Sequence, residues 1–410
     1  MKQTAFLLSI ILIPCFLFSQ KRCQEEKMNS LQDHKKLLLE KESTLFNYTV
    51  KHPQWKTNSI ITIPVVIHIL WNTPSQNISN AQVMSQMTIL NKDFRRSNAD
   101  TVDTPLPFQS IAADAQLEFC LAQRDPAGNP TTGITRRQTT VFSFSPLLGD
   151  TAIYYTSTGG EDAWDTASYM NIWVCNNGGG MATWPGSTSF FPGLQDGVIL
   201  DPLAFGDTGT VVAPTNKGRL ADHEIGHYFF LLHPWGADTI YCATDSVADT
   251  PPQKIPTLGC PTFPVLDSCT PNFPGITYNV YMDYTDDSCM NMFTAGEAAR
   301  MNLCIQVYRS TLLNSMACIP PAGYAENANE PELDISPNPS GGIFNVYLET
   351  QEKEEFSYTV FNDVGQLQRN GNFAANVCTN SLDLSGLSPG MYFLKLVSSS
   401  HSATRKLIIR

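Results

Sequence analysis

The sequence predicts a large α/β domain followed by a small all-β domain, and three features support this fold class. Apolar runs of strand character alternate with helical spacing from Ile60 onward. A histidine-rich stretch at 223–233 has the pattern of one further helix. After residue 333, short strand-like runs are separated by Gly, Pro, Asn and Ser turns. The 410 residues, 42% of them hydrophobic, suffice for one large core and one small one.

The first 57 residues are expected to be removed from the mature protein. Residues 1–20 combine Lys2 with the apolar run Ala5–Phe18, which is too short to span a bilayer and has the form of a secretory signal peptide. Residues 21–57 are charged and polar and are predicted to be a propeptide. The 11 cysteines indicate an oxidising compartment. A net charge of −12 argues against nucleic acid or an anionic membrane as partner, and we expect no integral membrane segment.

The elements of the α/β domain follow in order. Residues 60–70 predict a buried strand. Ser79 is the predicted N-cap of a helix whose apolar residues recur at helical spacing as far as Phe94. Residues 115–123 and 171–174 predict two more strands, the second of which leads into a glycine-rich loop. Alternation of this kind indicates an α/β upper half that holds the next helix.

That helix carries the residues with the clearest chemistry. Residues 223–233 are His-Glu-Ile-Gly-His-Tyr-Phe-Phe-Leu-Leu-His. On a helix, His223 and His227 lie one turn apart on one face, so both imidazoles can bind one ion. Glu224 lies beside the first, where a carboxylate can take a proton from a zinc-bound water. His233 could supply a third nitrogen, and three ligands with an open fourth position are typical of catalytic zinc.

The simpler alternative is an amphipathic core helix that is rich in histidine. An apolar stripe at helical spacing exists, formed by Ala221, Ile225, Tyr228 and Leu232. Such a stripe is compatible with a metal site, because a ligand-bearing helix needs one buried face to hold the other still. The sequence therefore favours zinc.

One residue departs from the pattern His-Glu-x-x-His-x-x-Gly-x-x-His of the metzincin clan of metallopeptidases. Phe230 occupies the glycine position, where the backbone often has a positive φ. Phenylalanine in that conformation costs about 1–2 kcal/mol. Either the turn is strained or built differently, or His233 is a weaker ligand. Glu297, on a predicted closing helix at 294–301, is the alternative third ligand.

Several segments resemble the pappalysin family of metzincins. Residues 279–284, Asn-Val-Tyr-Met-Asp-Tyr, resemble the methionine turn beneath the zinc. The resemblance makes Met282 the cushion under the imidazoles and Tyr284 a stabiliser of the reacting carbonyl. The other matching pieces are Ile63–His68, Phe119–Asp125, Asn171–Cys175, Gly178–Gly180, Gly218–Arg219, Asp249–Pro251 and Met282–Cys289. The resemblance implies an α/β metzincin-type zincin domain, with a mixed sheet plus zinc helix and an irregular C-terminal subdomain.

The loop-rich segment 236–289 contains four cysteines, which the sequence alone could pair in three ways. The resemblance implies the disulfides Cys242–Cys269 and Cys260–Cys289, which would staple a region with few apolar residues. Two further pairs are expected, Cys120 with Cys175 and Cys304 with Cys318.

The same segment offers hard oxygen ligands. These are Asp238, Asp245, Asp249 and Thr250. The resemblance implies a structural calcium ion here, and the alternative is a solvated acidic loop.

Two sets of residues are predicted to bind substrate. In zinc peptidases of this type, an edge strand upstream of the zinc helix pairs with the extended substrate, which assigns this role to Asn171 and Trp173. Asp287 follows the methionine turn, where the wall of the S1′ pocket is expected. A carboxylate there would favour Arg or Lys at P1′, as the resemblance also implies.

Cys23 is a candidate latency switch. A thiolate can occupy the open zinc position, and Arg22-Cys23 resembles the Arg-Cys-Gly of some pappalysins, with Gln24 in place of the glycine. The alternative is an unpaired cysteine near the terminus.

Residues 333–410 predict a small β-sandwich. The segments Ile335–Pro339, Val360–Gly365, Leu387–Tyr392 and Arg405–Arg410 closely resemble the C-terminal sorting domain of proteins exported by the type IX secretion system of Bacteroidota. The resemblance implies a Gram-negative source and passage across the outer membrane, followed by release or attachment to the cell surface.

The expected organisation is therefore signal peptide 1–20, propeptide 21–57, catalytic domain 58–318, linker 319–332 and sorting domain 333–410. The expected function is that of a secreted zinc endopeptidase acting on proteins and peptides. The competing hypothesis is a catalytically impaired adhesin that keeps the fold as a binding platform. Phe230 favours the adhesin, and the intact Glu224 favours the enzyme.

Overall fold

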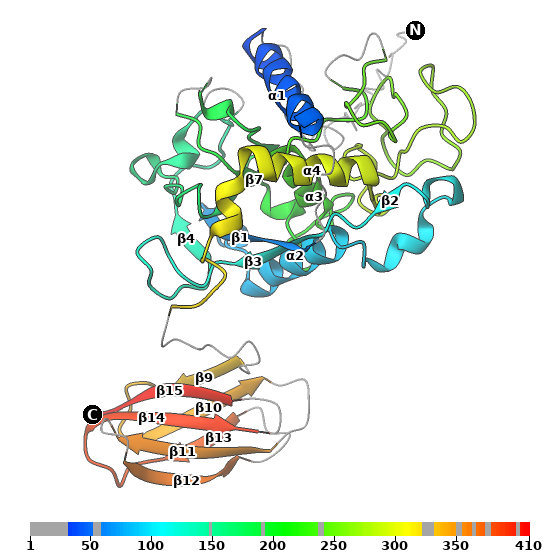
Figure 1. Cartoon of the computed structure of the whole chain (residues 1–410). Coiled ribbons are helices and arrows are strands. Elements are labelled where there is room, and N and C mark those ends of the chain that lie inside the picture. The colour runs from blue at the N-terminus through cyan, green and yellow to red at the C-terminus, as the bar shows by residue number, and fades with distance from the viewer. Residues whose placement is uncertain are drawn as a thin grey trace, which may run out of the picture. The chain divides into compact units, whose positions relative to one another are not determined.

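The computed structural model describes residues 32–51, 59–146, 150–189, 193–236, 242–321, 332–349, 355–362, 366–373, 379–398 and 402–410 (Figure 1). The predicted signal peptide, Cys23 and Asp238 lie outside these residues. The chain divides into two compact units between Pro321 and Ala322. An α/β unit precedes an all-β unit, which confirms the predicted fold class.

The helices of the first unit are α1 (Gln32–Lys51), α2 (Asn80–Asp93), α3 (Arg219–Tyr228) and α4 (Ala295–Tyr308). Its strands are β1 (Ile61–Trp71), β2 (Ala112–Ala113), β3 (Leu117–Leu121), β4 (Ile134–Gln138), β5 (Met170–Val174), β6 (Gly180–Ala182), β7 (Val198–Leu200) and β8 (Phe293–Thr294). Among the described residues, no helix combines the length and apolar character that crossing a membrane requires.

A six-stranded mixed sheet is the frame of this unit. Its order is β3-β1-β5-β7-β6, and β4 pairs with the second half of β1. The pairs of β1 with its neighbours and of β5 with β7 are parallel, whereas β6 runs antiparallel to β7 at one edge. The sheet therefore presents one short antiparallel strand next to the zinc-motif helix α3, which packs on β6 and β7.

The two faces of the sheet bury different cores, because successive strand residues point to opposite sides. On β5, Met170, Ile172 and Val174 join the large core formed with α2 and α3. Trp173, between them, joins a second core on the other face, with Tyr154 and Ile199. Helix α3 is thus packed against only one face of the sheet.

Local signals account for the helix boundaries. The Ser79 hydroxyl accepts a hydrogen bond from the Gln82 N–H and caps α2, as its sequence predicts. Thr294 and Glu297 form a capping box at the start of α4. Gly218, with φ of 73°, precedes α3, and only glycine adopts that conformation without strain.

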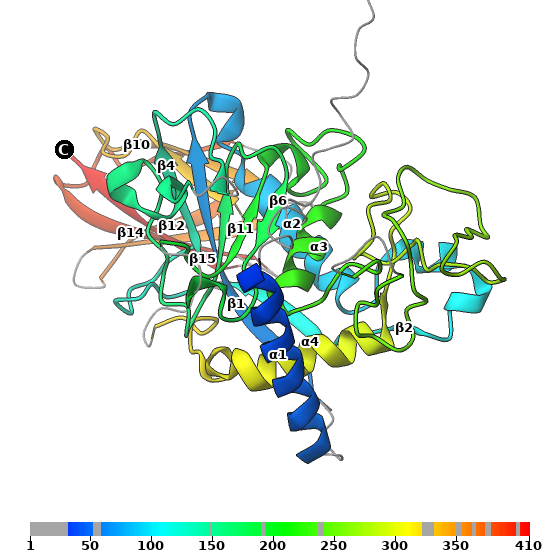
Figure 2. The ribbon, with the colours of Figure 1, turned by 90° about the horizontal axis from the view of Figure 1, so that it is seen from above.

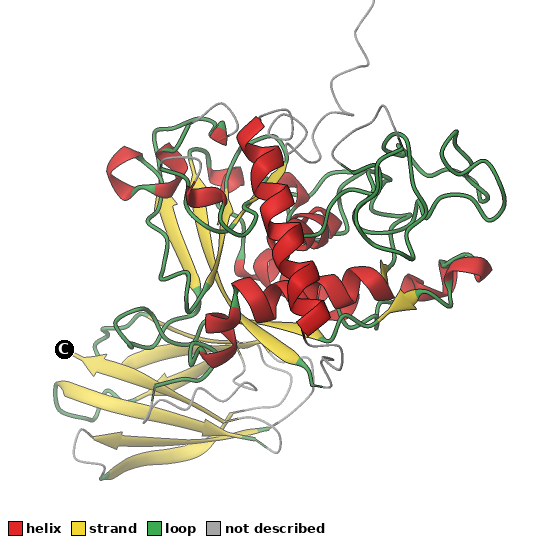
Figure 3. Cartoon of the chain, turned by 45° about the horizontal axis from the view of Figure 1, so that its top comes forward, coloured by secondary structure: helices red, strands yellow, loops and turns green. Residues whose placement is uncertain are grey.

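The segment between α3 and β8 is loop-rich, as Figure 3 shows by its green trace. Two disulfides cross it, Cys242–Cys269 and Cys260–Cys289, which are the pairs that the family resemblance implies. They restrain a stretch that has few regular backbone hydrogen bonds of its own.

The two remaining predicted disulfides are wrong. Cys120 pairs with Cys318, while Cys175 and Cys304 are free thiols buried in separate cores. The reason is the return path of the chain after α4: the Gln123 N–H donates to the Ala317 carbonyl at 2.7 Å, which brings the segment before Cys318 alongside the end of β3.

The second unit has its own apolar core between two antiparallel sheets. One contains β9 (Glu332–Ser336), β10 (Ile343–Glu349) and β13 (Thr379–Asp383), and the other contains β11 (Phe356–Asn362), β12 (Leu367–Phe373), β14 (Gly390–Val397) and β15 (Ser402–Ile409). Alternation of buried and exposed residues along β13 and β14 matches a sandwich with one face of each sheet inside.

Candidate metal centre and active site

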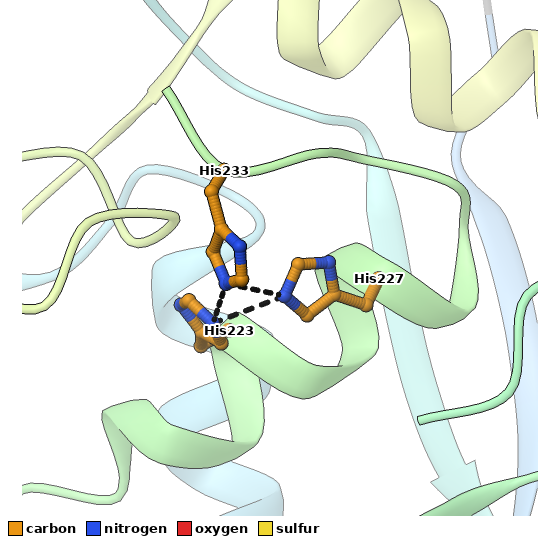
Figure 4. A group of neighbouring side chains, drawn as sticks. All are labelled: His223, His227 and His233. Carbon is orange, nitrogen blue, oxygen red and sulfur yellow. Dashed lines mark hydrogen bonds between the residues drawn. The ribbon is translucent and has the colours of Figure 1, made fainter. Parts of the chain in front are cut away.

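The imidazoles of His223, His227 and His233 converge on one point (Figure 4). Their Nε2 atoms lie 3.0 to 3.2 Å from one another. Three nitrogens at about 2.0–2.1 Å from one tetrahedral zinc ion would be separated by about 3.3 Å. The three side chains therefore have the spacing of a zinc-binding face, and all three are buried.

The protonation of two of the rings supports this assignment. His223 Nδ1 donates to the Tyr281 carbonyl at 2.7 Å, and His227 Nδ1 donates to the Leu231 carbonyl at 2.8 Å. In a neutral imidazole the other nitrogen then carries a lone pair. Burial, followed by the charge of neighbouring histidines, holds the pKa of His227 and His233 well below the usual value. Converging lone pairs on neutral rings fit a bound cation.

The turn that brings His233 to the other two rings is a Schellman motif. The Leu231 N–H donates to the Gly226 carbonyl and the Phe230 N–H to the His227 carbonyl, at 2.9 and 2.8 Å. Phe230 occupies the left-handed position of this motif with φ of 69°. The turn therefore has the expected geometry, at the cost of a strained phenylalanine. Glu297, the alternative third ligand, lies instead in the capping box of α4.

Met282 lies beneath the metal-binding face. A Cβ on Gly226 would lie 2.4 Å from the Met282 sulfur, so only glycine lets the helix approach this side chain. Tyr284 lies beside the ligands, its ring centroid 5.5 Å from that of His223 and 5.1 Å from that of His233. These positions suit a cushion and a hydroxyl donor next to the metal, the roles predicted for the two residues.

Glu224, the residue that follows His223, is fully buried. Gly180 of β6 lies directly against it: a Cβ at Gly180 would lie 2.4 Å from Glu224 Oε1. The edge strand thus fixes the space that the carboxylate occupies.

A small pocket opens beside His223. Its lining includes Thr215, Arg219, Leu220, Asp283, Tyr284, Asp287 and Met290. Asp287 is 2% exposed, and its Oδ2 accepts the backbone N–H groups of Lys217 and Arg219. The structure thus gives Asp287 a second task, because it also holds the start of α3.

The prediction that Asn171 and Trp173 bind substrate is wrong. β5 is paired on both sides, so it is not an edge strand. Asn171 and Trp173 are fully buried on the sheet face opposite α3. The Asn171 side chain bonds to His68 and to the Trp164 backbone.

Some of the residues proposed as calcium ligands lie close together near the start of α4. Asp245 and Thr250 are buried, and Asp249 caps α4 by accepting the Thr294 hydroxyl and the Gly296 N–H. Burial raises the pKa of Glu297, which also lies close enough to Asp245 and Asp249 for their negative charges to raise it further. Burial raises the pKa of Asp245 to about 7 and that of Glu297 to about 8. Among the described residues, Asp245 Oδ2 and Glu297 Oε1 have no hydrogen-bond partner.

Sequence reasoning assigned no role at this site to three residues. Trp235 stacks on His233 with ring centroids 4.5 Å apart and planes at 8°. Gly180 makes room for Glu224. Arg300 donates to the Phe230 carbonyl at 2.7 Å. The sequence could have pointed to Trp235, because it is an aromatic residue two positions after a candidate ligand. It could not have shown the contacts of Gly180 and Arg300, because these link segments far apart in the chain.

A buried histidine triad on a helix and the turn after it, with a glutamate beside the first ligand and a methionine below, defines a zinc metallopeptidase of the metzincin type. Comparison with known proteins agrees. The family model described as "Pregnancy-associated plasma protein-A" matches residues 154–306, and "Secretion system C-terminal sorting domain" matches residues 334–410.

Two solved structures match more than half of the chain. Mature mirolysin from Tannerella forsythia, in complex with a cleaved peptide, is 44% identical, with a TM-score of 0.60 over 64% of this chain and 99% of that chain. A promirolysin variant from the same organism is 39% identical, with a TM-score of 0.65 over 72% and 97%. The chain belongs to the pappalysin family of metalloendopeptidases, and its C-terminal sorting domain marks it for secretion.

Curated relatives cover less of the sequence. "Extracellular metalloprotease 1" of Coccidioides posadasii is 40% identical over 129 residues, which are 31% of this chain and 42% of that protein. "Extracellular metalloprotease" of Colletotrichum graminicola is 29% identical over 265 residues, 61% of this chain and 78% of that protein. The chain thus spans less than half of the first of these relatives.

Proposed function

We propose that this protein is a secreted zinc endopeptidase with Glu224 as its general base. The observation that carries the proposal is the triangle of Nε2 atoms, 3.0 to 3.2 Å on a side. Glu224 follows His223 in the chain and is fully buried against Gly180 of β6. His223, His227 and His233 would hold the ion. Bound zinc supplies Lewis acidity and lowers the pKa of a bound water.

The protein's own groups would then move the protons. Glu224 takes a proton from the attacking water and passes it to the leaving amine. The hydroxyl of Tyr284 donates to the carbonyl oxygen as negative charge develops there. Burial of Glu224 strengthens these interactions, because nearby water does not compete with them.

Casein cleavage by the mature form tests this proposal. We expect a zinc chelator to abolish cleavage and added zinc to restore it, and Glu224→Ala to abolish cleavage with zinc still bound. Cleavage that survives in Glu224→Ala would contradict the role of Glu224. The adhesin alternative is less favoured, because a binding platform gains nothing from a general base held beside a metal site.

The substrate is proposed to pair with β6, which replaces β5 in this role. β6 is the antiparallel edge of the sheet, and its Gly180 contacts Glu224. A peptide added to this edge would lie next to the metal site, and backbone pairing binds peptides with little regard to sequence.

Preference for Arg or Lys at P1′ is assigned to Asp287. The support is its place in the pocket beside His223. A peptide-library profile of Asp287→Asn tests this, with Asp286→Asn as the matched control. Loss of the basic preference only in Asp287→Asn supports the assignment, and an unchanged profile contradicts it.

Calcium is proposed as a structural ion near Asp245, Asp249 and Thr250. The support is a pair of buried carboxylate oxygens, on Asp245 and Glu297, for which the described part of the chain offers no hydrogen-bond partner. Neutralising buried acids by a divalent cation would stabilise the loops between α3 and α4.

Export and latency complete the proposal. The C-terminal unit would direct the protein to the type IX secretion machinery. Cys23 would block the zinc in the precursor until residues 21–57 are removed. Thiol modification of intact precursor tests the switch: a gain of activity supports it, and none contradicts it.

A further inference from the structure

α1 lies across α4 (Figure 2), and one apolar cluster joins α1 to the turn that carries the third zinc ligand. Leu45 of α1 is 3% exposed and packs in one apolar cluster with Trp184, Phe230 and Leu232. Phe230 is the strained residue of the turn, and Leu232 directly precedes His233. Leu45 of α1 therefore packs in one cluster with the chain neighbours of a candidate metal ligand.

Arg300 of α4 joins the same turn to α1 by charge. Its Nε donates to the Phe230 carbonyl at 2.7 Å, and its guanidinium lies 4.7 Å from the centroid of the Phe230 ring. The two terminal nitrogens of Arg300 donate to both carboxylate oxygens of Glu42 on α1. A bidentate pair of this kind fixes the guanidinium plane. Arg300 is 8% exposed, so the pair is largely shielded from water.

The glycine of the metzincin pattern could not make these contacts. A glycine at position 230 would take the left-handed φ without strain but would have no ring for Leu45, Trp184 and Arg300 to pack on. Phenylalanine pays the conformational cost and anchors the turn in the apolar cluster, where its ring is fully buried. The position of His233 thereby depends on the packing of α1.

We propose that Phe230 and Arg300 are positioning residues for the third zinc ligand and that α1 braces them through Leu45 and Glu42. The inference rests on the proposed zinc site and concerns its control. With α1 in place, the ligand turn is held and zinc is retained. Removal of α1 during maturation loosens the turn, so the precursor holds zinc more tightly than the mature form.

Zinc transfer to an excess of a chromogenic chelator tests this inference. The full chain is used with Glu224→Ala in every sample, so that no self-cleavage occurs. We expect Leu45→Ala to release zinc about fivefold faster, the effect of about 1 kcal/mol of coupling between neighbouring residues. Leu39→Ala is the matched control, because Leu39 lies on the same helix and is 70% exposed.

A second pair of variants tests the ionic contact. Glu42→Gln should also release zinc faster, whereas Glu40→Gln, whose side chain is 58% exposed, should not. Adding Phe230→Gly should remove the effect of Leu45→Ala, because the ring that couples α1 to the turn is gone. Equal zinc transfer in Leu45→Ala, Glu42→Gln and their controls would overturn the inference. So would an undiminished effect of Leu45→Ala beside Phe230→Gly. A reference chain that binds no zinc would instead overturn the proposed function.

Discussion

At the scale of single residues, two backbone positions decide the geometry of the site. Gly180 allows β6 to lie against Glu224, and Gly226 allows α3 to lie on Met282. Phe230 does the opposite, since it adopts a glycine conformation while carrying a large side chain. The position of the Glu224 carboxylate therefore depends on the missing side chain of Gly180, and the position of His233 depends on the large side chain of Phe230.

Gly180→Ala should lower kcat without loss of zinc. The added methyl group would displace Glu224, and a misplaced base of this kind costs about 100-fold in rate. Activity and metal content are measured together. Gly341→Ala in the second unit is the control, since a Cβ there meets nothing within 4 Å and Gly341 is not among the glycines with a positive φ. Similar kcat losses in both variants would contradict the role of Gly180.

The candidate ligands His223 and His227, together with Glu224, were predictable from the sequence because their spacing along one helix fixes their relative positions. His233 lies beyond that helix and was predictable only from its place in the metzincin pattern. The failure at Asn171 and Trp173 has an equally physical cause. All five residues of β5 are buried, so the strand has no polar-apolar alternation that would show which face meets α3. Its place inside the sheet depends on β7, which follows some 24 residues later.

At the scale of elements, α3 is fixed at its start by a buried arginine. Arg219 pairs with Asp93 and Asp100 and donates to the carbonyls of Asp287 and Met290. It thereby connects the zinc helix to α2 and to the wall of the pocket beside His223. None of these contacts follows from sequence spacing, since the partners lie between 68 and 126 residues away.

Arg219→Met should destabilise the protein by about 3–5 kcal/mol, because it leaves buried carboxylates without their cation. Chemical denaturation measures the loss. Arg95→Met is the control, since Arg95 pairs with acids that are 37% and 41% exposed and should contribute about 0–1 kcal/mol. Equal losses of unfolding free energy in the two variants would contradict the claim that the buried Arg219 pairs stabilise the fold more than the exposed Arg95 pairs.

The acids beside α4 predict a pH dependence. Burial raises the pKa of Glu297 to about 8 and of Asp245 to about 7. The folded state thus holds protons that the unfolded chain has released, and the stabilisation present at about pH 4 is lost as the pH rises to about 8. In calcium-free protein, the free energy of unfolding should fall by about 1.4 kcal/mol per pH unit for each group in this window.

Added calcium should remove this fall, because the cation favours the charged carboxylates. Glu297→Gln should make the slope shallower while it preserves the acceptor for the Thr294 N–H. Melting temperatures across the pH range, with and without calcium, check both statements. A pH slope that is the same in Glu297→Gln as in the parent chain would contradict them, whereas the buried histidines, whose pKa values are lowered, add the same opposite slope to both proteins.

At the scale of the whole chain, two separate cores account for the two compact units. The class of each unit was predictable from its pattern, α/β in one and short alternating strands in the other. The pairing of Cys120 with Cys318 was not, because the bond joins positions 198 residues apart. Only the path of the chain after α4 brings them together.

Cys120→Ala should lower the free energy of unfolding by about 2–5 kcal/mol, since the bond closes a long loop. The double variant Cys120→Ala with Cys318→Ala should be no less stable than either single variant, because one bond is lost in each case. Denaturation under oxidising conditions gives these values. Additive losses in the double variant would contradict the pairing.

X-ray absorption spectroscopy at the zinc edge of the mature form tests the central claim most directly. We predict one zinc per chain with three imidazole nitrogens at about 2.0–2.1 Å and one oxygen ligand. Replacement of His233 by alanine should remove one nitrogen from this shell. A chain purified without zinc, or a shell with a sulfur ligand or only two nitrogens, would contradict the metal site on which the proposed function depends.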